Sequence, residues 1–369
     1  MKTFNKLIRE LTEINGNSGY EDEVIKYIIK KLKDNASEIK VDSIGNVTAI
    51  YKCNKENAKK IMLFAHMDEV GMIVRKIEDN GILRAQKLGS VNPNILPGTM
   101  IEIIGEDKKI PGVIGAKSHH FLQAEDKYKV GNFEQLYIDI GATSKADVES
   151  LGVKVGNPIV YKSNFIELAN DQVCNKAMDN RAAISILLKI GININKDKLN
   201  SDLYLVFGVQ EEFNTRGMLP VVREVAPDIA IGFDVTPSCD VPDVKQYSDV
   251  VIGKGPALTY MNHHGRGTLA GLVANNKLLS FIEEVAEENN IQIQREVAIG
   301  VLTETAYIVF ENSNTVVANI SIPTRYTHTP IEVVSLKDIN ACYNLVCNFL
   351  NKYKGNENFK KSILLEGVL

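Results

Sequence analysis

Polar side chains of the kinds that bind metal ions or transfer protons stand just after several apolar runs of this 369-residue chain. The runs are short and continuous, which is typical of strands buried on both faces of a sheet. His66 follows residues 61–65, Glu211 and Glu212 follow 203–209, Asp234 follows 229–233, and His328 comes shortly after 316–322. In an open α/β sheet, ligands bind beyond the carboxyl ends of the strands, so we expect these side chains to meet in one crevice.

The triplet His66-Met67-Asp68 has the spacing of a metal ligand and a supporting carboxylate. Residues i and i+2 of a strand point to the same side, so Asp68 can hold the ring nitrogen of His66 that faces away from a metal. Such a contact fixes the tautomer of the ring and makes the ring a more basic ligand. Surface polar clusters also contain triplets of this kind, so the triplet alone leaves that interpretation open.

Two further segments each have an ordinary interpretation beside a functional one. Asp179 precedes an apolar-periodic helix, where it is either the N-cap of that helix or a carboxylate that bridges two cations. Glu211 and Glu212 are either two surface glutamates or a carboxylate pair at a site. Spacing alone does not exclude the other histidines of the chain from a histidine-based site, namely His119, His120, His263 and His264.

The predicted elements alternate between helices and strands, with one interruption. A helix is predicted from about Gly19, after a capping-box pattern that begins at Ser18, and a long one from about Thr268 to Glu288. Between residues 71 and 162 the chain instead shows short β-type runs separated by Gly and Pro. We therefore predict an α/β fold with a mixed, largely parallel sheet sandwiched by helices and an inserted all-β domain. The predicted main domain comprises residues 1–69 and 164–369, and the inserted β-domain comprises residues 70–163.

Composition excludes several classes of protein. The chain has 42 Lys and Arg against 46 Asp and Glu, without a block of like charges, so we expect neither nucleic acid nor an anionic membrane as a partner. Five cysteines without a Cys-x-x-Cys pair suit neither a disulfide framework nor a zinc ribbon, and we expect reduced thiols. The N-terminal residues form an amphipathic pattern that lacks the apolar core of a signal peptide. These features predict a cytoplasmic protein.

Several segments, taken together and in their order, resemble one family of enzymes. The segments are Ala65-His66-Met67-Asp68-Glu69-Val70-Gly71, Asp179-Asn180-Arg181, Gln210-Glu211-Glu212 with Arg216-Gly217, Gly253-Lys254-Gly255-Pro256, and Ile322-Pro323-Thr324-Arg325-Tyr326-Thr327-His328-Thr329-Pro330. The chain resembles the tetrahedral, cobalt- or zinc-dependent aminopeptidases, which include glutamyl and deblocking aminopeptidases and some relatives labelled endoglucanases. The resemblance spans nearly the whole chain.

The resemblance implies a metallopeptidase that removes the N-terminal residue of peptide substrates with two divalent metal ions per subunit, Zn or Co. It implies that Asp179 bridges the ions, with His66 and Asp234 on one ion and Glu212 and His328 on the other. It further implies Glu211 as the general base and Asp68 as the partner of His66. The inserted β-domain is implied to mediate dimer contacts, and the dimers to assemble into a homo-dodecamer.

The chain departs from the family pattern at three places. Ala182 follows Arg181 where the family has Gly, and Asn214 replaces a Gly after the glutamate pair, a change that a left-handed backbone at Asn tolerates. The run from Gly300 to Glu304 stands where the family has Gly-Gly-Thr-Asp, so we expect an altered loop at the substrate end.

Two other functions compete with a peptidase. A glycoside hydrolase uses a carboxylate pair, but it needs neither two histidines nor two further aspartates, and the chain has no Trp for sugar stacking. A non-catalytic scaffold is the second alternative, although every role of the two-metal scheme has an occupant.

Overall fold

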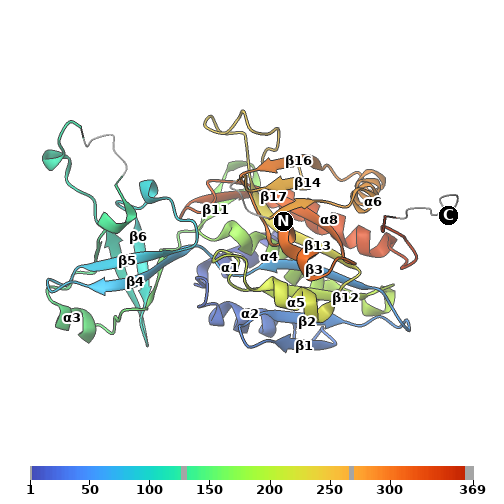
Figure 1. The fold of residues 1–369 in the computed structure, drawn as a ribbon, viewed down its shortest axis with the longest axis horizontal. Coiled ribbons are helices and arrows are strands. Elements are labelled where there is room, and N and C mark those ends of the chain that lie inside the picture. Colours follow the sequence, from blue (N-terminus) through green and yellow to red (C-terminus); the bar gives the residue numbers. More distant parts are fainter. Residues whose placement is uncertain (1, 126–130, 266–269, 362–369) are drawn as a thin grey trace.

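The computed structural model describes residues 2–125, 131–265 and 270–361. Two bodies are visible in Figure 1, a large sheet covered by helices and, on the left of the view, a smaller β-structure that contains β4, β5 and β6. No helix among the described residues is long and apolar enough to cross a membrane.

Four parallel strands form the centre of the large sheet: β3 (Lys60–His66), β12 (Asp202–Gly208), β13 (Ile229–Pro237) and β17 (Val316–Arg325). Their order is β12-β3-β13-β17, and nearly all of their residues are buried because both faces of the sheet are covered. Residues at the carboxyl ends of β3, β12 and β13 therefore share one edge.

Antiparallel strands extend this centre on both sides. One side carries β2 (Val47–Tyr51) and β1 (Glu38–Val41), and the other carries β18 (Glu332–Ser335), β11 (Gln172–Asn175) and β10 (Ile166–Leu168). A branch from β17 contains β14 (Ala257–His263), β15 (Gly271–Val273) and β16 (Gln294–Ile299). The sheet is thus mixed with a parallel centre, as predicted.

Helices cover both faces of the sheet, and two glycines identify the faces. Gly191 of α4 (Met178–Asn193) lies against Leu205 of β12. Gly208, three residues further along β12 and therefore facing the other way, lies against Met218 of α5 (Met218–Val225) and against Glu304. Beside α4 lie α1 (Lys2–Glu13), α2 (Asp22–Leu32) and α8 (Leu336–Lys352), and α8 contacts α6 (Asn276–Glu288). Beside α5 lie α7 (Ile308–Glu311) and the 3-10 helix η6 (Glu304–Tyr307). The predicted sandwich is confirmed.

The smaller body is a closed antiparallel barrel with its own hydrophobic core. Its strands, in barrel order, are β4 (Gly71–Ile77), β5 (Leu83–Leu88), β8 (Ile138–Asp139), β7 (Lys109–Ile114), β6 (Met100–Ile104) and β9 (Pro158–Tyr161), and a short helix, α3 (Lys145–Ser150), precedes β9. All six strands fall between β3 and β10 of the large sheet, so the barrel is an insertion in the chain. The closure is weakest between β5 and β8, which pair only at Leu83 and Ile138.

Three expectations about local structure were wrong. Ser18 does not cap α2, because the helix begins at Asp22 and the hydroxyl of Ser18 instead donates to Asp68. The helix expected from Thr268 begins at Asn276, since residues 271–273 form β15, and its first expected residues lie outside the described part of the chain. Asp234 does not follow its strand but lies within β13. The five cysteines are free, as expected.

Candidate metal centre

The five residues expected as metal ligands lie together at the carboxyl edge of the central strands. His66 is the last residue of β3, Asp234 lies in β13, and Asp179 is in the first turn of α4. Glu212 and His328 come from the loops that follow β12 and β17. Five separate segments thus deliver the side chains to one place.

Asp179 is at the centre of this cluster because its two carboxylate oxygens face different partners. Oδ1 lies 3.1 Å from Nε2 of His66, and that nitrogen lies 3.6 Å from Oδ1 of Asp234. Oδ2 lies 3.3 Å from Nε2 of His328, which in turn lies 3.2 Å from Oε1 of Glu212. Two triads that could each hold a metal ion therefore share Asp179.

The backbone of the ligand segments is locally irregular. Asp179 has a non-helical ψ of 102° inside the first turn of α4, and Ala177 at the N-cap is left-handed, with φ of 58°. Asp179 is therefore not an ordinary N-cap. His328 and Gln210, the residue before the glutamate pair, are left-handed too, with φ of 62° and 55°. Such conformations cost about 1–3 kcal/mol each and concentrate at functional sites.

Both histidines present Nε2 to the carboxylates and Nδ1 to a backbone carbonyl. Nδ1 of His66 lies 3.2 Å from the carbonyl oxygen of Asp68 and 3.4 Å from its Oδ1, and Nδ1 of His328 lies 3.0 Å from the carbonyl oxygen of Ser90. Since these neighbours only accept, each Nδ1 donates a proton to them, and Nε2 is the ring nitrogen that is available to a metal ion. The carboxylate oxygens around Nε2 require a positive charge there, which either a proton on the imidazole or a bound cation would supply.

The charges of the cluster therefore favour a cation. Burial opposes charge on His66, but the carboxylates of Asp179 and Asp234 outweigh burial and raise the pKa of its imidazole well above the usual range. Burial raises the pKa of Glu211 well above its usual range, and the nearby Glu212 raises it further. Oε1 of Glu212 is buried without a hydrogen-bond donor. Imidazoles and carboxylates that converge in this way are compatible with a divalent metal ion.

Asp68 supports the cluster more broadly than predicted. Its Oδ1 accepts a hydrogen bond from the backbone N–H of Glu211 at 2.9 Å. Its Oδ2 accepts from the backbone N–H of Glu212 at 3.1 Å and from the hydroxyl of Ser18 at 2.6 Å. The carboxylate is completely buried. Asp68 therefore fixes the glutamate pair relative to His66, and not only the His66 ring.

Two residues that hold the backbone of the ligand segments were not identified from the sequence. Asn46 accepts from the N–H of Val209 and donates to the carbonyl of Gly217, so it closes the base of the loop that carries the glutamate pair. Glu332 is a buried glutamate whose carboxylate accepts from the backbone N–H groups of Asp179 and His328. A lone acidic residue within the apolar run 331–334 was a signal for Glu332, because an acidic side chain is rarely buried without a partner.

The alternative histidines do not join the cluster within the described residues. His119 and His120 are exposed on a short 3-10 helix of the barrel, and His263 ends β14 with an exposed side chain. None of them, nor His264, belongs to a group of three metal-type side chains in the described part of the chain.

The departures from the family pattern have different consequences. Asn214 adopts a φ of 68°, so the left-handed backbone expected there is present. Glu304 is 2% exposed and lies against Gly208, where one of its oxygens has no hydrogen-bond partner. Burial raises its pKa to about 8, and the negative charges of Asp234 and Asp68 contribute. The Glu304 side chain, which is longer than the Asp of the family pattern, is therefore buried against β12 beside the cluster.

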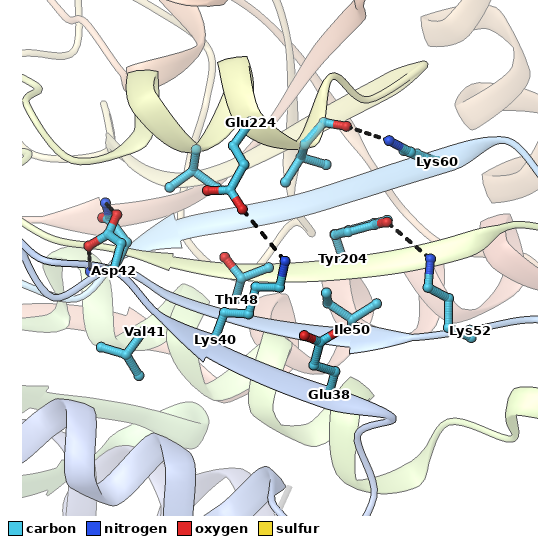
Figure 2. Close-up of a pocket in the computed structure, with 13 residues that line it drawn as sticks. Glu38, Lys40, Val41, Asp42, Thr48, Ile50, Lys52, Lys60, Tyr204 and Glu224 are labelled. Atoms are coloured by element: carbon cyan, nitrogen blue, oxygen red, sulfur yellow. Dashed lines mark hydrogen bonds and ion pairs between the residues drawn. The ribbon is translucent and has the colours of Figure 1, made fainter.

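A separate pocket, shown in Figure 2, lies between β1, β2, β12 and α5. Its three lysines are already paired: Lys40 with Glu224 at 3.6 Å, Lys52 with the hydroxyl of Tyr204 at 3.3 Å, and Lys60 with a backbone carbonyl of α5 at 2.8 Å. The lining contains no histidine, and none of its carboxylates belongs to a group of three metal-type side chains in the described part of the chain.

Comparisons with known proteins cover both the sheet and the barrel. A sequence profile of the M42 glutamyl aminopeptidase family matches residues 45–345. The Escherichia coli (strain K12) protein SgcX, which is named as an aminopeptidase, is 44% identical over 336 residues, covering 91% of this chain and 90% of SgcX.

Solved structures agree with this match. Aminopeptidase APDkam598 from the archaeon Desulfurococcus kamchatkensis superimposes with a TM-score of 0.91 at 32% identity, covering 98% of this chain and 99% of that chain. The TET1 peptidase of Pyrococcus horikoshii superimposes with a TM-score of 0.84 at 28% identity, covering 95% and 100%. TET1 is described as able to assemble into a tetrahedron or a large octahedral shell.

Proposed function

The chain belongs to the M42 glutamyl aminopeptidase family, and on that premise we propose that it removes the N-terminal residue of peptides by a two-metal mechanism. The observation that carries this proposal is the pair of triads that share Asp179. Each triad has one imidazole nitrogen and two carboxylates, which is a sufficient ligand set for a catalytic divalent ion with an open position.

The proposed ligands divide between two ions. His66, Asp179 and Asp234 hold the first ion, and Asp179, Glu212 and His328 hold the second. Two such ions, when bound, supply a more acidic water and polarise the scissile carbonyl. Zn, Co and Mn all suit imidazole and carboxylate ligands, and Zn or Co is our proposal for this chain.

Glu211 is the proposed general base. Its carboxylate lies 4.0 Å from Nε2 of His66 and belongs to neither of the two triads that share Asp179, although His66, Glu211 and Glu212 also lie close enough together to form a third such group. It accepts the proton of the attacking water and later donates that proton to the leaving amine. Asp68 holds the backbone N–H of Glu211, so it keeps this carboxylate at a fixed place beside the cluster.

The proposed metal site favours substrates with a free N-terminus. The charge of two divalent ions would offset the carboxylates of Glu211, Glu212, Asp179 and Asp234, so the acidic residues alone would not select a protonated amine. We propose that one bound ion would accept the neutral α-amine of the peptide as a ligand, which would restrict cleavage to the first residue.

A homo-oligomer is the proposed assembly, with the inserted domain of residues 70–163 mediating dimer contacts and the dimers forming a dodecamer. The support is the fold shared with TET1 of Pyrococcus horikoshii, which forms closed shells. Mass photometry of the purified protein measures the number of subunits, and a monomer at micromolar concentration contradicts this part of the proposal.

The activity is tested with a panel of aminoacyl chromogenic substrates in the presence of Zn, Co or Mn. We expect turnover of at least one free-amine substrate, no turnover of its N-acetylated form, and no release of sugar from a β-glucan. Cleavage of the acetylated substrate argues for an endopeptidase, and β-glucan hydrolysis argues for the glycoside hydrolase. Failure with every substrate and metal favours the non-catalytic scaffold.

A further inference from the structure

Glu332 is a buried carboxylate that makes two hydrogen bonds to the backbone of the candidate metal centre. It is 1% exposed and is the first residue of β18. Its Oε2 accepts the backbone N–H of Asp179 at 2.9 Å, and its Oε1 accepts the backbone N–H of His328 at 2.6 Å. One side chain thus links two of the segments that carry the proposed ligands.

The fold explains why these segments meet at Glu332. In the pairing of β18 with β11, Glu332 lies opposite Asn175, the last residue of β11, and the chain then enters α4, which carries Asp179. His328 is only four residues before Glu332, in the loop between β17 and β18. The carboxylate therefore occupies the space between the start of α4 and this loop.

The two segments need such a brace because neither has regular backbone geometry. Asp179 has a non-helical ψ, and His328 and Tyr326 are left-handed, with φ of 62° and 60°. Backbone N–H groups in such segments lack the regular partners of a helix or strand and must find others when buried. Glu332 supplies those partners through two charge-assisted hydrogen bonds.

No ion pair in the described part of the chain accounts for an acid at this position. Among the described residues, Glu332 has no ion pair with a Lys, Arg or His side chain. A buried carboxylate without a cationic partner is costly, and an apolar residue would fit the neighbouring positions of β18, which are Val333 and Val334. Its oxygens point at the backbone of two proposed ligands and not at a cation.

We infer that Glu332 is a positioning residue that sets the separation of Asp179 and His328 and thereby the affinity of the ion held by Asp179, Glu212 and His328. This inference rests on the proposed two-metal function. Both ions share Asp179, but the ion held with Glu212 and His328 depends on Glu332 through two of its ligands, whereas the ion held with His66 and Asp234 depends on it through Asp179 alone.

The test is the variant Glu332→Gln. The amide oxygen still accepts one N–H, but the amide NH₂ group faces the other N–H, so one of the two bonds is lost. Zinc is titrated by calorimetry into protein that has first been treated with a chelator, and metal content after dialysis is measured by mass spectrometry. We expect wild type to bind two zinc ions. Glu332→Gln should also bind two, but the affinity for one of them should be about 10–100-fold weaker than in wild type.

A matched control is Asp338→Asn. Asp338 is also fully buried, and its carboxylate also accepts two backbone N–H groups, those of Gly253 at 2.6 Å and Gly255 at 2.7 Å. Those groups belong to no segment of the metal centre. Asp338→Asn should therefore lower thermal stability while it keeps both zinc affinities of wild type.

The outcomes separate the inference from the proposed function. A wild-type protein that binds fewer than two ions contradicts the proposed function, whereas wild-type affinity for both ions in folded Glu332→Gln contradicts the inference alone. An equal loss of zinc affinity in Asp338→Asn also contradicts the inference, because a general loss of stability then explains the effect.

If Glu332→Gln does not fold, Glu332→Asp replaces it. The shorter side chain reaches only one of the two N–H groups, and wild-type zinc affinity in that variant is the contradicting result. Turnover of either Glu332 variant should recover as zinc concentration is raised.

Discussion

Replacement of Asp68 by asparagine tests how firmly the glutamate pair must be held. Asp68 is fully buried and accepts hydrogen bonds from the N–H groups of Glu211 and Glu212 and from the hydroxyl of Ser18. The asparagine side chain would keep one oxygen and turn an NH₂ group toward the donors on the other side. At least one donor would then lose its acceptor beside a fully buried side chain.

The magnitude follows from the hydrogen bonds that are lost. A buried donor without an acceptor costs about 1–3 kcal/mol, so the free energy of unfolding of the metal-free protein should fall by about that amount. Loss of a group that supports metal ligands lowers metal affinity or activity by about 10–100-fold, which corresponds to about 1.4–2.7 kcal/mol. We therefore expect kcat/KM of Asp68→Asn to fall by about 10–100-fold.

The assay compares kcat, KM and zinc affinity of Asp68→Asn with those of wild type and of Ser18→Ala. Ser18→Ala removes one of the three donors and leaves the glutamate backbone held, so its kcat/KM should fall less than about tenfold. A folded Asp68→Asn protein with wild-type kcat/KM and wild-type zinc affinity would refute the supporting role of Asp68.

Three further predictions concern pH, packing and metal removal. Burial raises the pKa of Glu21 to about 7, above its value of about 4.3 in an unfolded chain. The folded metal-free protein therefore holds the proton more tightly than the unfolded chain, and its stability falls by up to about 4 kcal/mol as pH rises from about 4.3 to about 7. Glu21→Gln should lack this loss when urea unfolding is compared at about pH 5 and about pH 8, and a wild-type pH dependence in the variant contradicts the assignment. Leu63→Ala, in the completely buried centre of β3, should lower the free energy of unfolding by about 2–5 kcal/mol, and a loss below about 1 kcal/mol would show that the strand is not packed as described. Dialysis against a strong chelator should abolish aminopeptidase activity and added Zn or Co should restore it, whereas activity that survives complete metal removal argues against a metal enzyme.

The parts of the fold that followed from the sequence are those with a strong local signal. The apolar runs that became β3 and β12 are long enough to be buried strands, and the Gly and Pro punctuation between residues 71 and 162 marks the change to short antiparallel strands. Closure of those strands into a barrel depends on pairing between segments that are distant in the sequence. The hydrophobic periodicity of a single strand does not indicate which strand it pairs with.

Predictions from local sequence patterns were wrong where a side chain or strand makes contacts with distant parts of the chain. Ser18 has the spacing of a helix cap, but its hydroxyl is used by Asp68, which lies 50 residues away. Asp234 looked like a residue beyond its strand because the apolar run ends at Phe233, but the strand continues to Pro237 beside β17. Asp234 is accommodated inside a central strand because it faces the cluster.

For the site, strand ends identified a crevice, and the family resemblance selected His66 and His328 from the six histidines of the chain. The structure brings both to Asp179. Glu332 and Asn46 were not found, because their importance lies in bonds to backbone N–H groups whose positions only the folded chain defines.

The central claim is that Glu211 is the base of a two-metal site, and Glu211→Gln tests it most directly. The variant keeps the size of the side chain and removes its ability to accept a proton at neutral pH. We predict that it binds two zinc ions per subunit, as wild type should, while kcat on the best aminoacyl substrate falls by about 10²–10⁴-fold. Undiminished turnover in this variant with both ions bound would contradict the account.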